Sequence, residues 1–156
     1  MPRRGLNSEI LVERAIELID REGLDVLTLA RLATEVGVAT PSLYKHIDGL
    51  AQLRELAAIA LVDELSTILA AAPSGTSPVS GLGAAYRDFA RQHPGGYALT
   101  QSALSSEQAR AAAARTVDVV LAALSSYEIP PAQRIHAVRL VRASLHGFVD
   151  LERLGG

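Results

Sequence analysis

The spacing of hydrophobic residues predicts a helix at the start of the chain. Its apolar positions recur every three or four residues, as on one face of an α-helix: Leu11, Ala15, Leu18 and Ile19. Asn7 stands before this stripe as the expected N-cap, and Glu9 places a carboxylate in the first turn, where the helix dipole favours it. Gly23 follows the stripe and predicts its end.

Two further short helices are predicted over 28–36 and 40–46. Thr28 is the expected N-cap of the first, and Gly37 stands just after its end. Pro41 suits the first turn of the next helix, because that turn does not need its missing N–H. Asp48-Gly49 is a turn signal that keeps this helix short.

The rest of the chain also shows helical rather than alternating periodicity. A fourth helix is expected over 50–72 with apolar residues nearly all round, so we expect it to be buried on several sides. Residues 73–81, PSGTSPVSG, predict a loop. Further helices are expected near 82–92, 97–104, 106–127 and 132–154. The fold class is therefore all-α, with about eight or nine helices.

Composition narrows the class of protein. The 156 residues are 49% hydrophobic but only 4% aromatic, which favours a helical core of Leu, Ile, Val and Ala. Cysteine is absent, which excludes disulfides, thiol catalysis and cysteine-ligated zinc. No signal peptide and no membrane-spanning tract is recognisable, so we expect a soluble cytoplasmic protein without a membrane partner. The histidines lack metal-ligand spacing and no catalytic triad or phosphate loop is recognisable, so we expect neither an enzyme nor a cofactor.

The segment 28–46 matches a helix-turn-helix, whose second helix enters the major groove of DNA. Gly37 can take the positive φ that a sharp turn needs. Small residues at the start of the second helix and donors at its end suit contact with phosphates and bases: Thr40, Pro41, Ser42, Tyr44, Lys45 and His46. Taken singly, Gly37 is compatible with an ordinary helix end and Tyr44 with half-buried packing; the combination at this spacing favours DNA binding.

The charge balance of this region limits how one copy could bind DNA. Residues 1–55 contain seven Lys or Arg against nine Asp or Glu. Because most of these acids lie in the first helix, we expect that helix to face away from DNA. The basic groups left for contact are Arg3, Arg4, Arg31 and Lys45. We therefore expect two copies to bind successive turns of one face of the duplex.

The segments EGLDVLTLARLA, EVGV and PSLYKHIDG, at these spacings, resemble the TetR/AcrR family of transcriptional regulators. The resemblance covers residues 6 to about 62, and SLHGFVDLE near the end resembles an element of one subgroup. It implies a DNA-binding domain, placed here at 1–49, and an effector-binding and dimerisation domain at 50–156. It also implies that Thr28 contacts phosphate. By the same resemblance, Thr40, Pro41 and Ser42 face the groove, and Tyr44, Lys45 and His46 contact the DNA backbone or base edges.

Two features depart from the family pattern. Leu50 stands where the family commonly has a lysine at the start of the fourth helix, which removes one expected phosphate anchor. The family also usually continues into one more helix after the last one here. We expect either an unusual dimer interface or further C-terminal residues outside this sequence.

The C-terminal half is expected to hold an effector pocket between helices. Apolar residues with a few polar points are the candidate lining, although each is also compatible with plain core: Ile59, Val62, Tyr86, Phe89, Tyr97, Leu99, Val117, Leu121 and His146. The last helix is the dimerisation candidate, with an ordinary bundle helix as the alternative. Its candidate interface combines apolar and small residues: Val138, Val141, Ser144, Leu145, Gly147 and Phe148.

Together with the resemblance, the sequence leads us to expect a ligand-responsive regulator that binds a palindromic double-stranded DNA operator as a homodimer. The resemblance implies a repressor, because that is the commoner role in the family, whereas the residues themselves do not distinguish a repressor from an activator. An effector that rearranges the fourth helix would change the separation of the two recognition helices. The alternative is a helical sensor or interaction protein that has lost specific DNA binding, which the acidic N-terminal region and Leu50 would support.

Overall fold

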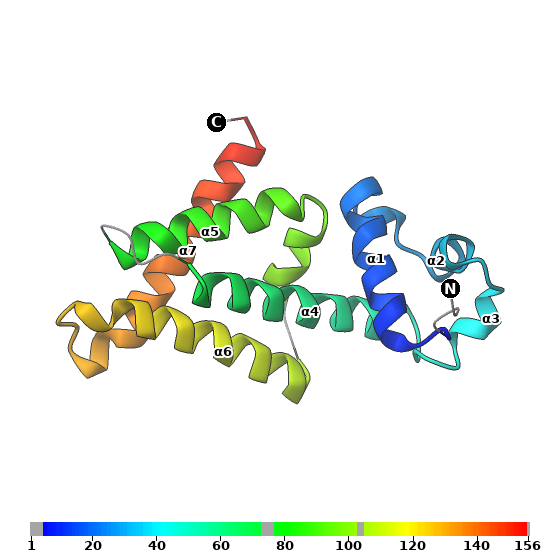
Figure 1. Cartoon of the computed structure of the whole chain (residues 1–156), viewed down its shortest axis with the longest axis horizontal. Coiled ribbons are helices and arrows are strands. Elements are labelled where there is room, and N and C mark those ends of the chain that lie inside the picture. The colour runs from blue at the N-terminus through cyan, green and yellow to red at the C-terminus, as the bar shows by residue number, and fades with distance from the viewer. Residues whose placement is uncertain (1–4, 73–76, 103–104, 156) are drawn as a thin grey trace. The chain divides into compact units, whose positions relative to one another are not determined.

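The computed structural model describes residues 5–72, 77–102 and 105–155, and every regular element in these ranges is a helix (Figure 1). The α-helices are α1 (Ser8–Glu22), α2 (Leu29–Val36), α3 (Thr40–Leu43), α4 (Leu50–Ala70), α5 (Pro78–Gln92), α6 (Glu107–Ala123) and α7 (Arg134–Arg153). Short 3-10 turns connect them: η1 (Leu24–Val26), η2 (Gly96–Gln101), η3 (Leu124–Ser126) and η4 (Pro131–Gln133). The all-α prediction is confirmed.

The chain divides into two compact units. The first contains Met1–Leu61 together with His93–Ala109, and the second contains Val62–Gln92 together with Arg110–Gly156. Helix α4 begins in the first unit and ends in the second. The chain leaves the first unit after Leu61, returns to it at His93 and leaves it again after Ala109, so neither unit is a single stretch of sequence. The domain boundary placed between residues 49 and 50 from the family resemblance stays a prediction.

Local side-chain chemistry sets the limits of α1 and α2. Asn7 Oδ1 accepts a hydrogen bond from Ile10 N at 2.9 Å, and Thr28 Oγ1 accepts one from Arg31 N at 3.1 Å, so both predicted N-caps are confirmed. Gly37 ends α2 in the left-handed region with φ 71°, which only glycine adopts without strain. The caps therefore specify where the helix-turn-helix begins and turns.

Helix α3 is shorter than the range 40–46 that the sequence predicts. Its α-helical part ends at Leu43, and residues 44–46 continue as a turn. The turn is closed by His46 N, which donates to Leu43 O at 2.9 Å. Ile47 is buried, as is Leu43, so the chain bends to place both side chains in the core. That bend is what ends the helix early.

Helix α4 is buried on several sides, as its pattern predicts. Its buried residues fall on more than one face: Leu53, Ala57, Ala58, Ile59, Leu61, Val62, Leu65 and Leu69. A surface helix would bury a single stripe. The burial follows from the position of α4 in both units, because each unit covers part of its length.

In the second unit, α5 packs against α7, and α6 is joined to α4 by polar contacts. Ser66 and Thr116 share a hydrogen bond of 2.6 Å between their hydroxyl oxygens, and Arg115 pairs with Asp63 at 2.5 Å. The predicted loop 73–81 is partly wrong, because α5 already begins at Pro78; residues 73–76 lie outside the described residues. Among the described residues no helix is both long and apolar enough to span a membrane.

Candidate nucleic-acid interface

The turn between α2 and α3 is held by backbone hydrogen bonds that follow from Gly37. Gly37 N donates to Thr34 O at 3.2 Å, and Val38 N donates to Ala33 O at 3.0 Å. These bonds close the end of α2 while the left-handed conformation of Gly37 redirects the chain. Helices α2 and α3 pack against each other across this turn. The result is the helix-turn-helix geometry that the sequence predicts.

The recognition segment, residues 40–47, contains two buried side chains that anchor it and exposed side chains between them. Leu43 is fully buried and Ile47 nearly so. Between them Tyr44 is 57% exposed, and Lys45 is exposed. The half-buried packing role considered for Tyr44 is therefore not what the structure shows. Two buried side chains, Leu43 and Ile47, thus flank a short turn that exposes two hydrogen-bond donors, Tyr44 and Lys45.

The other predicted DNA contacts are at the surface to different extents. Pro41 is exposed, and three residues are partly exposed: Thr40, Ser42 and His46. Thr28 is exposed, and its hydroxyl oxygen already caps α2. Arg3 and Arg4 lie outside the described residues. These contacts with DNA stay predictions.

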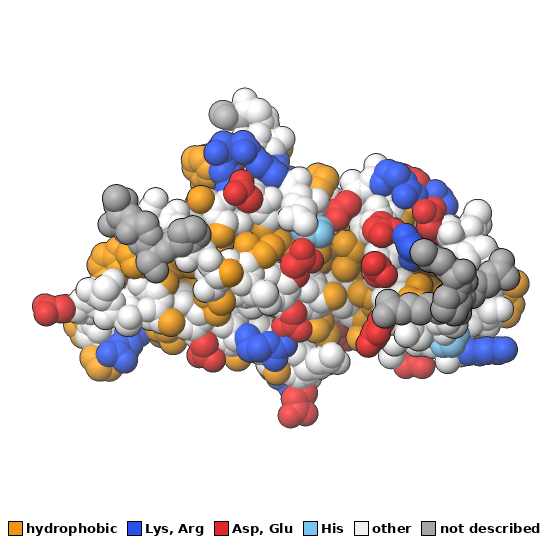
Figure 2. Space-filling model, in the orientation of Figure 1, with side chains coloured by type: hydrophobic (Ala, Val, Ile, Leu, Met, Phe, Trp, Pro, Cys, Tyr) orange, Lys and Arg blue, Asp and Glu red, His pale blue; other side chains and the backbone are white. Residues whose placement is uncertain are grey.

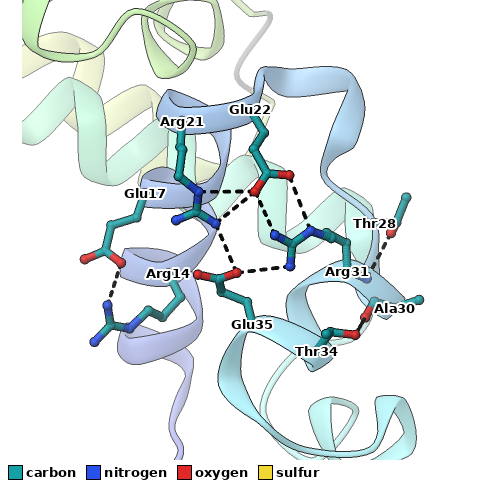
Figure 3. A network of polar contacts seen from close by, with 9 residues as sticks. All are labelled: Arg14, Glu17, Arg21, Glu22, Thr28, Ala30, Arg31, Thr34 and Glu35. Carbon is teal, nitrogen blue, oxygen red and sulfur yellow. Dashed lines mark hydrogen bonds and ion pairs between the residues drawn. The ribbon is translucent and has the colours of Figure 1, made fainter.

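Arg31 does not project freely from α2. Its guanidinium donates to Glu22 of α1 at 2.7 Å and to Glu35 of α2 at 3.0 Å, and Arg21 joins the same two carboxylates (Figure 3). The hydrogen bonds from Arg31 and then Arg21 hold the pKa of Glu22 below its usual range. A phosphate contact by Arg31 would therefore have to compete with two carboxylates.

In this four-residue network two arginines pair with two glutamates, so the carboxylates of Glu22 and Glu35 are balanced by neighbouring positive charges. Basic and acidic side chains lie side by side over α1 and α2 on the face drawn in Figure 2. Arg14 and Glu17 form a further pair at 2.5 Å on α1. Pairing neutralises carboxylates that would otherwise repel phosphate. Lys45, by contrast, has no ion-pair partner among the described residues, so its charge is available.

The residues predicted to line an effector pocket are mostly core. Six of the nine are buried: Ile59, Val62, Tyr86, Phe89, Tyr97 and Leu99. Val117, Leu121 and His146 are partly exposed. The structure has a cavity of about 180 Å³ beside Leu121 and Tyr127, and one of about 390 Å³ lined by the ends of α4, α5 and α6. Of the predicted residues, only Leu121 lines either cavity, so the predicted lining stays a prediction.

The predicted dimer residues lie on different faces of α7. Val138 is buried, and Leu145 lies within reach of α5, since a methyl group on Gly83 would be 3.6 Å from Leu145 Cδ2. Ser144, Gly147 and Phe148 are exposed. Larger apolar side chains share this exposure: Leu140, Leu151 and Leu154.

A helix-turn-helix unit with an exposed recognition segment, joined through a long helix to a helical bundle, defines a DNA-binding transcriptional regulator. Residues 11–58 match the model of bacterial regulatory proteins of the tetR family, and residues 79–156 match the tetracyclin repressor-like C-terminal domain. The chain therefore belongs to the TetR family of transcriptional regulators, as its sequence resemblance indicates. Members of this family are regulators and not enzymes.

Three relatives illustrate the range of similarity. Rv0681 of Mycobacterium tuberculosis, an uncharacterized HTH-type transcriptional regulator, is 38% identical over 96% of this chain and 72% of its own length. The class D tetracycline repressor of Escherichia coli is 33% identical over 36% of this chain and 26% of its own length. The crystal structure of BioQ with its double-stranded DNA operator is 26% identical, with a TM-score of 0.73 over 94% of this chain and 87% of that one.

Proposed function

We propose that this protein is a ligand-responsive repressor that binds a palindromic operator as a homodimer. The observation that carries the DNA-binding part is the recognition segment, where buried Leu43 and Ile47 present exposed Tyr44 and Lys45. The relative BioQ was solved on its operator, and the E. coli relative is named a repressor, which supports the same role here.

Homodimerisation is supported by the outward face of α7. Gly147 lies inside this helix, where glycine costs roughly 0.5–1 kcal/mol relative to alanine. A methyl group added at Gly147 would meet no heavy atom within 4 Å, so packing within the protomer gives no reason for a glycine. Close approach of a second α7 gives one, and exposed Leu140, Phe148 and Leu151 would be covered by it.

The interface is tested by the oligomeric state. Gly147→Leu should leave the protomer folded, because Gly147 is exposed and a Cβ atom there would meet no heavy atom within 4 Å. The variant should shift a dimer toward monomer in sedimentation equilibrium. Ala113→Leu on α6 is the matched control, since Ala113 is also small, helical and exposed. A dimer unaffected by Gly147→Leu would place the interface elsewhere.

DNA binding is tested by a gel shift with the protein's own upstream DNA, measured across a range of salt concentrations. The proposal expects a shift that weakens steeply as salt rises, because binding releases counterions from phosphates. An absent or salt-independent shift would instead favour a helical sensor that has lost DNA binding. Specific binding should also survive an excess of unrelated DNA.

The ligand-responsive part is supported by the two cavities of the second unit, the larger of which is bordered by Leu69, Leu82 and Val119. These residues would suit an apolar effector of modest size. A screen of small apolar compounds for release of the operator tests this. If compounds bind but none changes operator affinity, the protein is a constitutive DNA binder.

A further inference from the structure

The turn His93-Pro94-Gly95-Gly96, which follows α5 directly, is docked on the C-terminal turn of α1. Asp20 of α1 holds this turn through both carboxylate oxygens. Asp20 Oδ2 lies 2.7 Å from His93 Nδ1, and Asp20 Oδ1 accepts from Gly96 N at 2.7 Å and from Gly95 N at 3.1 Å. Consecutive N–H groups that converge on one carboxylate oxygen form a compact anion nest. The side chains of His93 and Asp20 are only 10% and 17% exposed.

At Gly95 the turn approaches α1 too closely for a side chain, and at Gly96 the space is tight. A Cβ atom on Gly95 would lie 2.0 Å from Ile19 O, which is a backbone atom and cannot move aside. On Gly96 it would lie 3.0 Å from Leu61 Cδ1. Gly95 has φ −93°, so its backbone conformation is ordinary and only the contact excludes a side chain. The turn and α1 are thus in direct backbone contact.

The segment after the turn is fixed in the core of the same unit. Tyr97 and Leu99 are buried, and Tyr97 N donates to His93 O at 2.9 Å. Thr100 is also buried, and its hydroxyl donates to Tyr97 O at 2.7 Å. The docked turn therefore cannot shift alone, because the buried η2 segment continues from it.

The last turn of α1 contacts not only the 93–96 turn but also α2. Arg21 and Glu22, next to Asp20 in the chain, are the α1 members of the network with Arg31 and Glu35 of α2 (Figure 3). One turn of α1 is thus bound on one side to the segment that follows α5 and on another to the first helix of the helix-turn-helix. Three adjacent residues carry both sets of bonds.

We propose that Asp20 is a positioning residue, and that the docked 93–96 turn couples α5 to the helix-turn-helix through the end of α1. The chain passes from the second unit into the first between Gln92 and His93. A displacement of α5 that pulls on the turn would strain the Asp20 bonds, and the Arg21 and Glu22 contacts would carry that strain to α2. This inference deepens the proposed function and rests on it for its regulatory meaning.

The coupling is tested first without DNA or effector, by amide hydrogen exchange on the full chain. Asp20→Ala removes the carboxylate that contacts His93, Gly95 and Gly96, and it keeps a good helix former in α1. We expect faster exchange in residues 93–101 and also in α2, which makes none of the bonds to Asp20 described above, by about fivefold or more. Glu17→Ala is the matched control, because it removes an exposed carboxylate of the same helix that pairs with Arg14.

Two further variants separate coupling from general damage. Asp20→Asn keeps one oxygen for the glycine N–H groups and should give a smaller increase in the same two segments. Gly95→Ala should reproduce the effect of Asp20→Ala from the other side of the contact. Faster exchange in 93–101 with α2 unchanged would overturn the proposal, and so would an equal increase in α2 for Glu17→Ala.

A second experiment adds operator DNA. Binding should slow exchange in α5 of the wild type, and Asp20→Ala should lose this response while keeping its own affinity within about tenfold. An α5 response that persists in Asp20→Ala would overturn the coupling. If the wild type binds no operator, the proposed function fails, and the DNA-free exchange result still decides whether Asp20 couples the turn to α2.

Discussion

Lys45→Ala gives the sharpest test of the proposed interface. Lys45 is exposed, stands next to Tyr44 in the recognition segment and has no ion-pair partner among the described residues. Its removal should therefore leave the fold intact, and buried Leu43 and Ile47 should still hold the segment. If Lys45 contacts phosphate, the variant should bind all DNA sequences more weakly by a similar factor.

The size of the effect follows from counterion release. Each phosphate contact contributes a slope of about 0.9 to the dependence of log affinity on log salt concentration, so two copies of Lys45 in a dimer contribute about 1.8. Between 50 and 200 mM salt, a fourfold change, the wild type should lose roughly tenfold more affinity than the variant does. At the higher concentration the two proteins should therefore bind more nearly alike.

Fluorescence anisotropy of labelled operator at four or five salt concentrations measures the slope directly. Arg14→Ala is the matched control, because it removes one positive charge from the same domain, but a charge that is paired with Glu17. Its slope should stay close to that of the wild type. An unchanged slope for Lys45→Ala, or an equal loss of slope in both variants, would show that Lys45 does not contact phosphate.

Four further outcomes are expected. Thr40→Ala should change which operator sequence is preferred in a selection from random DNA. An equal loss of affinity on every sequence would show that Thr40 does not contact the base edges. Leu43→Ala should lower the free energy of unfolding by about 2–5 kcal/mol in urea titrations, because the side chain is fully buried. Arg54→Met should raise it by roughly 1–3 kcal/mol, since Arg54 Nε is buried without a hydrogen-bond partner among the described residues; an unchanged or lower value would contradict that reason. The hydrogen bond from Arg31, the largest cause, holds the pKa of Glu22 below its usual range in the folded protein. The network should therefore contribute its whole stabilisation above about pH 4.3, and this contribution should be lost as the pH falls through the lower pKa of the folded state. The difference in unfolding free energy between wild type and Glu22→Gln should accordingly shrink in acid.

The elements that sequence predicts well are those whose limits depend on neighbouring residues. Asn7 and Thr28 each accept a hydrogen bond from the backbone N–H three residues later in the chain, and the conformation of Gly37 itself turns the chain. Such signals are complete within a few positions, so α1, α2 and the turn appear where expected. The end of α3 is harder to predict, because it depends on which core position Ile47 must reach.

The contacts that sequence does not predict join residues far apart in the chain. Arg31 carries a positive charge in any sequence-based count, yet two carboxylates engage it, one of them on another helix. Asp20 counts as one more acid of the first helix, yet it organises a turn 73 to 76 residues later. The Gly95-Gly96 pair is visible in the sequence, but two glycines indicate only that another group approaches closely and do not identify that group.

Helix α7 shows why an apolar pattern alone does not define an interface. One stripe, with Val138 and Leu145, packs within the protomer, while Leu140, Leu151 and Leu154 are exposed. Both stripes obey helical spacing, so periodicity identifies the helix and leaves open which stripe another molecule would cover. Gly147 indicates which of the two stripes another molecule would cover. It is exposed in the protomer, and no contact within the protomer explains why a glycine stands there. A second copy supplies that reason if the two α7 helices approach closely at Gly147, with the exposed leucines covered on either side of the crossing.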